Sequence, residues 1–433
     1  MERNIVYKVH STAPPKKCGI ASFSSREMQE ASKQARVGGV IWDAHYHNEA
    51  EDLPSSRFRG AIKYTTDLTS DNIDIQRKAA ETVRDAETAR AMGMDLADYF
   101  GHEYGIFRDG KGRDILVPMM RESRKNGVIT VFHPHTILEN PEDFGPDYRS
   151  IMNGAVQEAD LILAMTPKAI DMLENIYHAP RENIMYNPHG VDVFTTGGTR
   201  EELKKKYFRG CSDFNLDLSA GFFSEGKRIH ESLAARALED DSWGKTNDKY
   251  LVLGLHKDKE WVEKCYEFAD KLGFNPIMIG DGDDGKGLEQ LAEHDLSENR
   301  VIFLNAYTTV KQSAEAKKMA RKVVVVNDSA SQISSGEIVG ALASKRVSLS
   351  YASPISEDLA REGAGFSVKH GDVGALALSS HFFNTEANKA ALELSSGIVS
   401  TRFHWDKTVR DFVDATALIV DDREEKRLES KVA

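Results

Sequence analysis

Short apolar segments alternate with charged, amphipathic segments along almost the whole chain of 433 residues. The apolar segments have the length of β-strands, and several of the amphipathic ones are as long as a helix. This alternation predicts consecutive βα units, which form a parallel sheet with helices on its faces. The expected fold class is therefore α/β, with doubly wound, Rossmann-like sheets.

The alternation falls into two halves. The strands expected in the first half cover 4–10, 38–43, 61–65, 98–101, 128–132, 160–165 and 184–187. Those expected in the second half cover 217–223, 249–255, 276–279, 301–305, 322–327 and 346–350. Between them, residues 187–199 are rich in turn-forming residues and indicate a linker.

We therefore expect an N-terminal domain over 1–200 and a C-terminal domain over 201–400, facing each other across a cleft. Each is long enough to bury a core of its own. In the segment 401–433 we expect an amphipathic helix over 403–420, followed by a charged and frayed tail.

Composition limits the location and the partners. The chain is 40% hydrophobic and 29% charged, has no apolar run of about 18 residues, and begins without the apolar core of a signal peptide, so we expect a cytoplasmic protein. A formal charge of -12 argues against broad nucleic-acid binding. The lysine runs at 204–206 and 317–318 are interpreted as solvated helix faces, although peripheral membrane contact through one of them stays open.

Metal and disulfide chemistry find little support. Cys18, Cys211 and Cys265 are odd in number and far apart, which fits neither a disulfide framework nor a cysteine zinc site. The acidic stretch at 281–284 is interpreted as a surface turn. We therefore assign no metal ligands.

The entrance to an apolar helix after the strand 322–327 is the first candidate site. Small and hydroxyl residues there leave outward-facing backbone N–H groups at the positive end of the helix dipole, a place to hold a phosphate. A serine-rich N-cap that only begins the helix is the alternative interpretation. The candidate phosphate ligands are Gln332, Ser334, Ser335, Gly336 and Glu337.

Glycine turns follow the first strand of each half. The turn after 217–223 carries Lys227 and Arg228, and a lysine at this point can reach a phosphate as a point charge. The alternative is that both cations project into solvent. In the first half, Gly19 would let backbone N–H groups approach a ligand closely.

Histidines follow two further strands of the first half. His102 and Glu103 come after the strand 98–101, and His133 and His135 come after 128–132. Carboxyl ends of parallel strands meet at one edge of a sheet, so these side chains are expected to share a site. Hydrogen bonding to a substrate is one interpretation, and a structural role for His133 is another.

Together these motifs resemble the retaining GT-B glycosyltransferases of family four, in the subset with H-E-[FY]-G-I-F and Q-x-S-S-G. The matches are P-P-x-x-C-G-I-A-x-F at 14–23, H-E-[FY]-G-I-F at 102–107, H-T-[VI]-L at 135–138, P-H-G-V at 188–191, G-x-x-S-x-G-K at 221–227 and Q-x-S-S-G at 332–336. The resemblance implies a GT-B fold of two Rossmann-like domains. The C-terminal one would bind a nucleoside diphosphate sugar, the N-terminal one would face the acceptor, and a C-terminal helix would cross back to the N-terminal domain.

The resemblance also implies roles for residues. Gly19 would lie near the reacting diphosphate and His135 near the transferred sugar, while Lys227 and the amides of Ser335 and Gly336 would hold the donor phosphates. His102, Glu103 and His133 would lie on the acceptor side.

The implied activity is transfer of a sugar, a hexose, to an acceptor hydroxyl with retention of configuration, without a required cofactor and with a divalent metal optional. A nucleotide-sugar isomerase, a phosphorylase, or a nucleotide-sugar-binding protein without catalysis are the alternatives. The donor base, the sugar, the acceptor and the oligomeric state stay open.

The chain departs from the wider family at two places. Gln332 and Gly340 stand where the family has the glutamates of E-x7-E, which leaves the contact to the donor ribose unassigned. Glu337 lies on the same helix face and is the expected substitute. Phe222 replaces the arginine that precedes the family's lysine, and Arg228 is expected to restore that charge.

Overall fold

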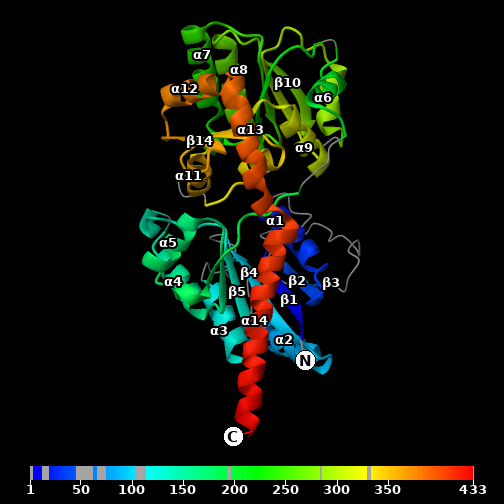
Figure 1. Ribbon diagram of the computed structural model, residues 1–433, viewed down its shortest axis with the longest axis vertical. Coiled ribbons are helices and arrows are strands. Elements are labelled where there is room, and N and C mark those ends of the chain that lie inside the picture. The colour runs from blue at the N-terminus through cyan, green and yellow to red at the C-terminus, as the bar shows by residue number, and fades with distance from the viewer. Residues whose placement is uncertain are drawn as a thin grey trace. The chain divides into compact units, whose positions relative to one another are not determined.

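The computed structural model describes residues 3–11, 19–44, 62–65, 75–102, 107, 114–143, 145–192, 197–209, 211–282, 285–328 and 333–432. The chain forms two compact units. Unit 1 comprises Met1–Gly190, Ser331–Ser334 and Trp405–Ala433, and unit 2 comprises Val191–Ala330 and Ser335–His404. In its described part, each unit is built on one parallel sheet with helices against it (Figure 1).

The described part of unit 1 contains a seven-stranded sheet in the order β3-β2-β1-β4-β5-β6-β7. Its strands are β1 (Asn4–Ser11), β2 (Val37–Ala44), β3 (Ile62–Thr65), β4 (Met94–His102), β5 (Ile129–Pro134), β6 (Leu161–Ala164) and β7 (Ile184–Tyr186). All seven were expected from the sequence. The strand order reverses between β1 and β4, and the carboxyl ends of two such strands are where open α/β sheets bind ligands.

Six α-helices of unit 1 lie in the described residues. They are α1 (Gly19–Ala31), α2 (Ile75–Ala91), α3 (Leu116–Lys125), α4 (Tyr148–Glu158), α5 (Pro167–Asn175) and α14 (Trp405–Val432). The last helix returns from the end of unit 2 and packs against α1 and β5, so that Val409, Phe412 and Val413 enter the unit 1 core.

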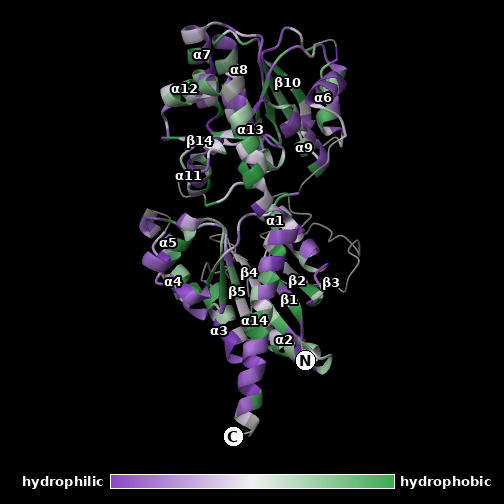
Figure 2. Ribbon diagram, viewed as in Figure 1, coloured by the Kyte–Doolittle hydropathy of each residue, from purple (hydrophilic) through white to green (hydrophobic). Residues whose placement is uncertain are grey.

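The expectation of a frayed tail after residue 420 is wrong, because α14 continues to Val432. The final turns are hydrophilic (Figure 2), and ion pairs hold them. Asp421 pairs with Arg36 at 3.1 Å, and Arg423 pairs with Asp160 at 2.6 Å. Within the helix, Lys426 and Asp422 lie 2.7 Å apart at the i, i+4 spacing that stabilises helices.

Unit 2 also has a seven-stranded parallel sheet among its described residues, in the order β10-β11-β9-β8-β12-β13-β14. Its strands are β8 (Leu216–Ala220), β9 (Lys249–Leu253), β10 (Ile277–Gly282), β11 (Val301–Ala306), β12 (Lys322–Val325), β13 (Val347–Tyr351) and β14 (Gly365–Val368). Only β14 was not expected. Here the order reverses between β8 and β12, so this unit's candidate ligand edge is at their carboxyl ends.

The α-helices of unit 2 cover both faces of this sheet. They are α6 (Arg200–Tyr207), α7 (Ile229–Trp243), α8 (Lys259–Lys271), α9 (Val310–Met319), α10 (Gly336–Ala343), α11 (Pro354–Arg361), α12 (Val373–Phe383) and α13 (Glu386–Ser400). Two separate apolar clusters pack against the sheet, one including α9 and α10 and the other including α7, α8 and α12. No helix in the described ranges combines the length and apolar character needed to cross a bilayer.

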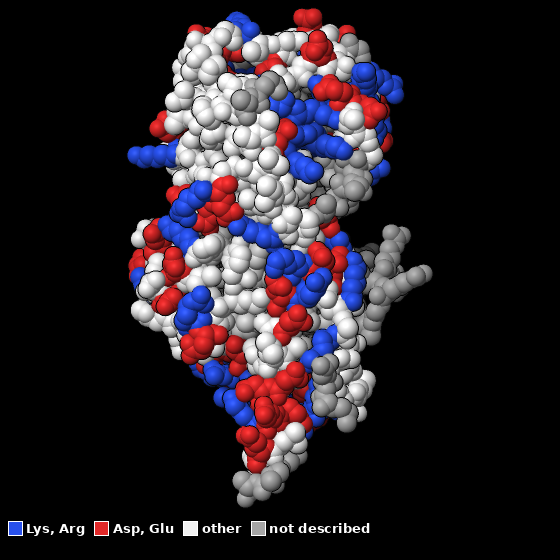
Figure 3. Space-filling model, in the orientation of Figure 1, with Lys and Arg blue, Asp and Glu red and all other residues white. Residues whose placement is uncertain are grey.

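The interpretation of the lysine runs as solvated faces is only partly right. Basic side chains gather over α6 and α9 (Figure 3), and Lys205 and Lys206 are exposed. Lys204 and Lys317, however, are buried. The Lys204 ammonium donates to the carbonyl oxygen of Phe214 at 2.7 Å, and the Lys317 ammonium forms an ion pair with Glu337 at 2.9 Å. Burial of a lysine requires such partners.

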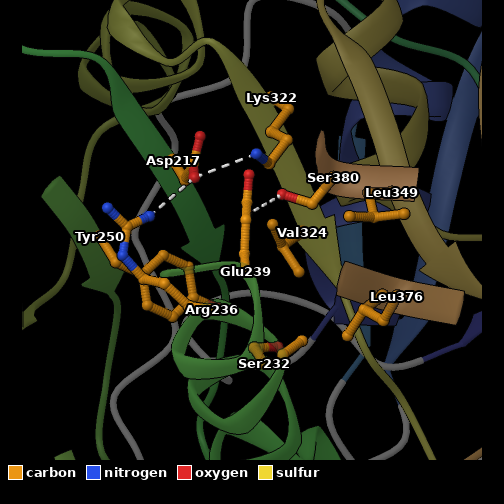
Figure 4. A pocket seen from close by; sticks show the side chains of 11 residues that line it. Asp217, Ser232, Arg236, Glu239, Tyr250, Lys322, Val324, Leu349, Leu376 and Ser380 are labelled. Atoms are coloured by element: carbon orange, nitrogen blue, oxygen red, sulfur yellow. Dashed lines mark hydrogen bonds and ion pairs between the residues drawn. The ribbon is translucent and has the colours of Figure 1, made fainter. Parts of the chain in front are cut away.

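A buried charge cluster joins the first residues of β8 and β12 in unit 2 (Figure 4). One carboxylate, Asp217, lies 2.9 Å from Arg321, 3.0 Å from Arg236 and 3.1 Å from Lys322. Burial alone would raise the pKa of Asp217, but these three cations hold it well below its usual range. Burial lowers the pKa of Lys322 to about 8, so its charge is the least stable of the three.

Replacing Asp217 tests this cluster. Asp217→Asn leaves three buried cations without their shared anion, and we expect it to lower the free energy of unfolding by about 3 to 5 kcal/mol. Lys322→Met removes the cation that burial already disfavours while Arg321 and Arg236 stay, so we expect a change under about 1 kcal/mol. Urea denaturation of both variants is the measurement, and equal losses would contradict the account.

Candidate functional site

The turn after β8 places Lys227 at the candidate ligand edge of unit 2. Gly221 leaves the strand with φ 124°, a value that a side chain would strain. A short 3-10 turn, Glu225–Lys227, follows, and Arg228 then adopts a left-handed conformation with φ 43° before α7 begins. The chain thus turns sharply after the strand and holds Lys227 beside the sheet edge.

The N-terminus of α10 lies at the same edge. Ser335 has an extended conformation and its hydroxyl accepts the N–H of Ile338 at 3.5 Å, so the alternative interpretation of a serine N-cap is correct for this side chain. The amides of Gly336 and Glu337 come before the first intrahelical donor, and Gly336 is exposed. What this helix end can offer an anion is therefore backbone N–H groups and dipole.

Three observations bring the two segments together. β8 and β12 are neighbours in the sheet, and the amide of Asp328 after β12 donates to the carbonyl oxygen of Gly226 at 2.8 Å. A Cβ on Gly221 would lie 4.0 Å from Cγ of Glu337. The glycine turn and the first turn of α10 therefore share one site in unit 2.

Lys227 and Arg228 differ in their surroundings. Lys227 is half-buried and forms no side-chain hydrogen bond or ion pair with the part of the chain that is described. Burial lowers the pKa of the Lys227 ammonium, and the negative charge of Glu337 partly offsets this decrease. Arg228 instead pairs with Asp328 at 2.7 Å. Lys227 can therefore still pair with an anionic ligand, whereas Arg228 already has an anionic partner.

In unit 1 an aromatic cluster forms at the carboxyl end of β5. The ring of Phe23, from α1, lies 4.7 Å from His135, 4.6 Å from His189 and 5.2 Å from Trp405. The rings of His133 and His135 are 5.2 Å apart. His189 was in a recognised motif but not among the candidate site residues.

His133 belongs to a buried hydrogen-bond network. Its Nδ1 is 2.6 Å from the hydroxyl of Tyr99, which also bonds to Glu27. Burial and the charge of Glu27 raise the pKa of Tyr99 well above its usual value, so the hydroxyl keeps its proton. His133 is fully buried beneath the cluster, so no part of its side chain is accessible to an acceptor substrate. The structural interpretation of His133 fits this position.

Some predicted site residues are not placed. Glu103 and Gln332 lie outside the described residues, as do the side chains of His102 and of the first residues of α1. Gly19 is the first residue of α1. Ser334 is half-buried. In the described ranges, no group of three or more histidine, cysteine, aspartate or glutamate side chains is arranged to hold a metal ion.

The network partners Glu27 and Tyr99 were missed from the sequence. Glu27 follows Phe23 by four residues, so both point from one face of α1. A glutamate on the buried face of an amphipathic helix indicates that it has a buried partner. The sequence does not identify this partner, because Tyr99 on β4 is 72 residues away.

No protein-family model and no curated protein sequence matches the chain. Solved structures match nearly all of it. A glycosyltransferase from Rickettsia africae ESF-5 has 13% sequence identity and a TM-score of 0.67, covering 97% of this chain and 99% of that one. Sucrose-phosphate synthase from Thermosynechococcus elongatus has 12% identity and a TM-score of 0.66, covering 97% and 100%. Anabaena HepE in complex with UDP and glucose has 15% identity and a TM-score of 0.63, covering 95% and 99%.

These similarities confirm the predicted fold class, which is GT-B with two Rossmann-like sheets and a C-terminal helix that returns to the N-terminal unit. At such low identity they show the fold alone.

The pH dependence of stability tests the environment of His189, which is half-buried among the rings of the aromatic cluster. Burial lowers the pKa of His189 to about 4, below its ordinary value of 6.5. Between these values the unfolded chain binds a proton that the folded one does not, so stability is lost as the pH falls. We expect His189→Asn, which retains a donor, to reduce the loss in unfolding free energy between pH 7 and pH 5 by about 1 to 2 kcal/mol. His178→Asn, at an exposed histidine, is the matched control, and an unchanged pH dependence in His189→Asn would contradict the lowered pKa of this ring.

Proposed function

We propose that the chain is a retaining glycosyltransferase that moves a sugar, a hexose, from a nucleoside diphosphate donor to an acceptor hydroxyl. The observation that carries the proposal is the half-buried Lys227 ammonium on the turn beside the N-terminus of α10. Fixed amides, a helix dipole and a lysine that forms no ion pair with the described chain form a site suited to a diphosphate. The solved structures with this fold include HepE bound to UDP and glucose, which supports the same class of donor.

In the proposed reaction, the positive charge of the site stabilises the leaving group. When the bond between the sugar and the diphosphate breaks, the electron pair stays on the diphosphate oxygen. Lys227 and the α10 amides stabilise the negative charge that develops there more than the charge already present. The acceptor oxygen attacks the anomeric carbon from the side of the leaving group, and its proton passes to the departing phosphate. This route needs no protein nucleophile and agrees with retention of configuration.

The resemblance supplies the remaining roles, which stay predictions. Gly19 and His135 are assigned to the reacting diphosphate and the transferred sugar. Glu337 is assigned to the hydroxyl groups of the donor nucleoside in place of the family's second glutamate. The acceptor is assigned to unit 1, whose aromatic cluster offers apolar rings of the kind that sugars contact.

Removal of the Lys227 charge tests the role of this residue. We expect Lys227→Met to lower kcat/KM for the donor on the order of 10² to 10³-fold, the loss typical of one group that stabilises an oxyanion. Lys264→Met is the matched control, because Lys264 is exposed and pairs with Glu260 on α8. Turnover in Lys227→Met equal to that of the control would remove Lys227 from the mechanism.

A thermal-shift screen of nucleotides and nucleotide sugars identifies the donor. A ligand present at 100 times its dissociation constant adds about 2.7 kcal/mol to the free energy of unfolding. We expect a nucleoside diphosphate sugar to stabilise the protein, and the loss of this shift in Lys227→Met. Stabilisation by none of the nucleotides would contradict the proposal.

Product analysis with the identified donor separates the alternatives. A transferase requires an acceptor and yields a product with the anomeric configuration of the donor. Conversion of the donor alone would indicate an isomerase, and dependence on inorganic phosphate would indicate a phosphorylase. Binding without turnover would indicate a protein that has lost catalysis.

A further inference from the structure

Gly340 and Lys317 occupy the region beneath the first turns of α10. Gly340 lies one helical turn after Glu337, and a Cβ at this position would come within 3.0 Å of Cε of Lys317. The stem of Lys317, from α9, therefore uses the space that a side chain at 340 would fill. Lys317 is buried, with 5% of its surface exposed.

The head of Lys317 has two partners. Its ammonium lies 2.9 Å from Oε2 of Glu337 and donates to the hydroxyl of Ser313 at 2.7 Å. Ser313 is one turn earlier on α9, so this hydrogen bond fixes the direction of the lysine. The side chain of Glu337 as a whole is more accessible, at 25%, although Oε2, the atom that faces Lys317, is buried. A buried cation, oriented by Ser313, thus pairs with the buried oxygen of a side chain that is otherwise partly exposed.

Glu337 is the one acidic residue in the first turn of α10. A carboxylate in this turn is attracted by the same amides and dipole that suit a phosphate. If it turned toward these amides, it would compete with the ligand and repel it. Its ion pair with Lys317 draws it instead toward α9.

We propose that Lys317 is a positioning residue of the phosphate site: by holding the carboxylate of Glu337 toward α9, it keeps the N-terminus of α10 open for the diphosphate. The inference rests on the proposed function, because it assumes that an anion binds at this helix end. It assigns to Gly340 the role of making room for the lysine stem. It also distinguishes Lys317, which acts through Glu337, from Lys227, which acts on the ligand.

A double-mutant cycle with inorganic pyrophosphate tests the inference, since this probe has the phosphates of the donor but no ribose. Dissociation constants are measured by calorimetry for the full chain and for Lys317→Met, Glu337→Gln and the double variant. We expect Lys317→Met to weaken binding about tenfold, from the repulsion of one uncompensated charge nearby. In the Glu337→Gln background the same substitution should change binding less than about threefold.

Two further variants complete the design. Gly340→Val keeps every charge but fills the space of the lysine stem, so we expect it to weaken pyrophosphate binding in the same direction as Lys317→Met. Lys311→Met removes a cation from the same helix at a position that is 69% exposed, and we expect binding to be unchanged.

The outcomes separate the inference from the function on which it rests. An equal loss from Lys317→Met in both backgrounds would mean that the lysine acts by its own charge, and it would overturn the positioning role. Unchanged binding in Lys317→Met would overturn it as well, while leaving the phosphate site intact. Failure of the unsubstituted protein to bind either pyrophosphate or a nucleoside diphosphate would overturn the phosphate site and this inference with it.

Discussion

The account depends on one unbalanced charge, the Lys227 ammonium at the carboxyl edge of the unit 2 sheet. A lysine that has lost part of its hydration normally gains a carboxylate, as Lys322 does with Asp217. Lys227 has no ion pair with the described residues, and Glu337, the carboxylate that acts on it, is paired with Lys317. The protein therefore leaves a cation undercompensated where a helix N-terminus adds further positive potential. An anionic ligand would complete this arrangement.

At two other places in the described structure, in contrast to Lys227, buried and surface charges have partners. At the other end of β8 and β12, three buried cations surround Asp217, and Arg321 also pairs with a second carboxylate, Asp248, at 2.9 Å. Along α14, acidic and basic side chains pair with each other and with other elements of unit 1. The two ends of the β8–β12 pair thus serve different purposes: one stabilises the fold, and the other is left ready for a ligand.

Local patterns predicted most of the fold. Strands with consecutive valines, such as β12, and glycine turns after them are visible in a single sequence, so thirteen of the fourteen described strands were expected. β14 was missed because Gly365–Val368 is short and only partly apolar. The helical tail was missed because distant partners such as Arg36 and Asp160 hold it.

The candidate site was predicted less completely, for the same reason. Lys227 and Gly336 could be identified because they lie in local turn and helix-entrance patterns. The role of Glu27 depends on Tyr99 from another element, and that of Gly340 on a lysine from α9, which no local pattern reveals. Arg228 was expected to serve the ligand, but its ion pair with Asp328 depends on the neighbouring loop.

The central claim is tested most directly by a crystal structure of the full chain with a nucleoside diphosphate bound. The account predicts phosphate oxygens within hydrogen-bond distance of the Lys227 ammonium and of the backbone amides at Gly336 and Glu337, with Glu337 still paired to Lys317. A diphosphate bound elsewhere, with Lys227 directed into solvent, would contradict it.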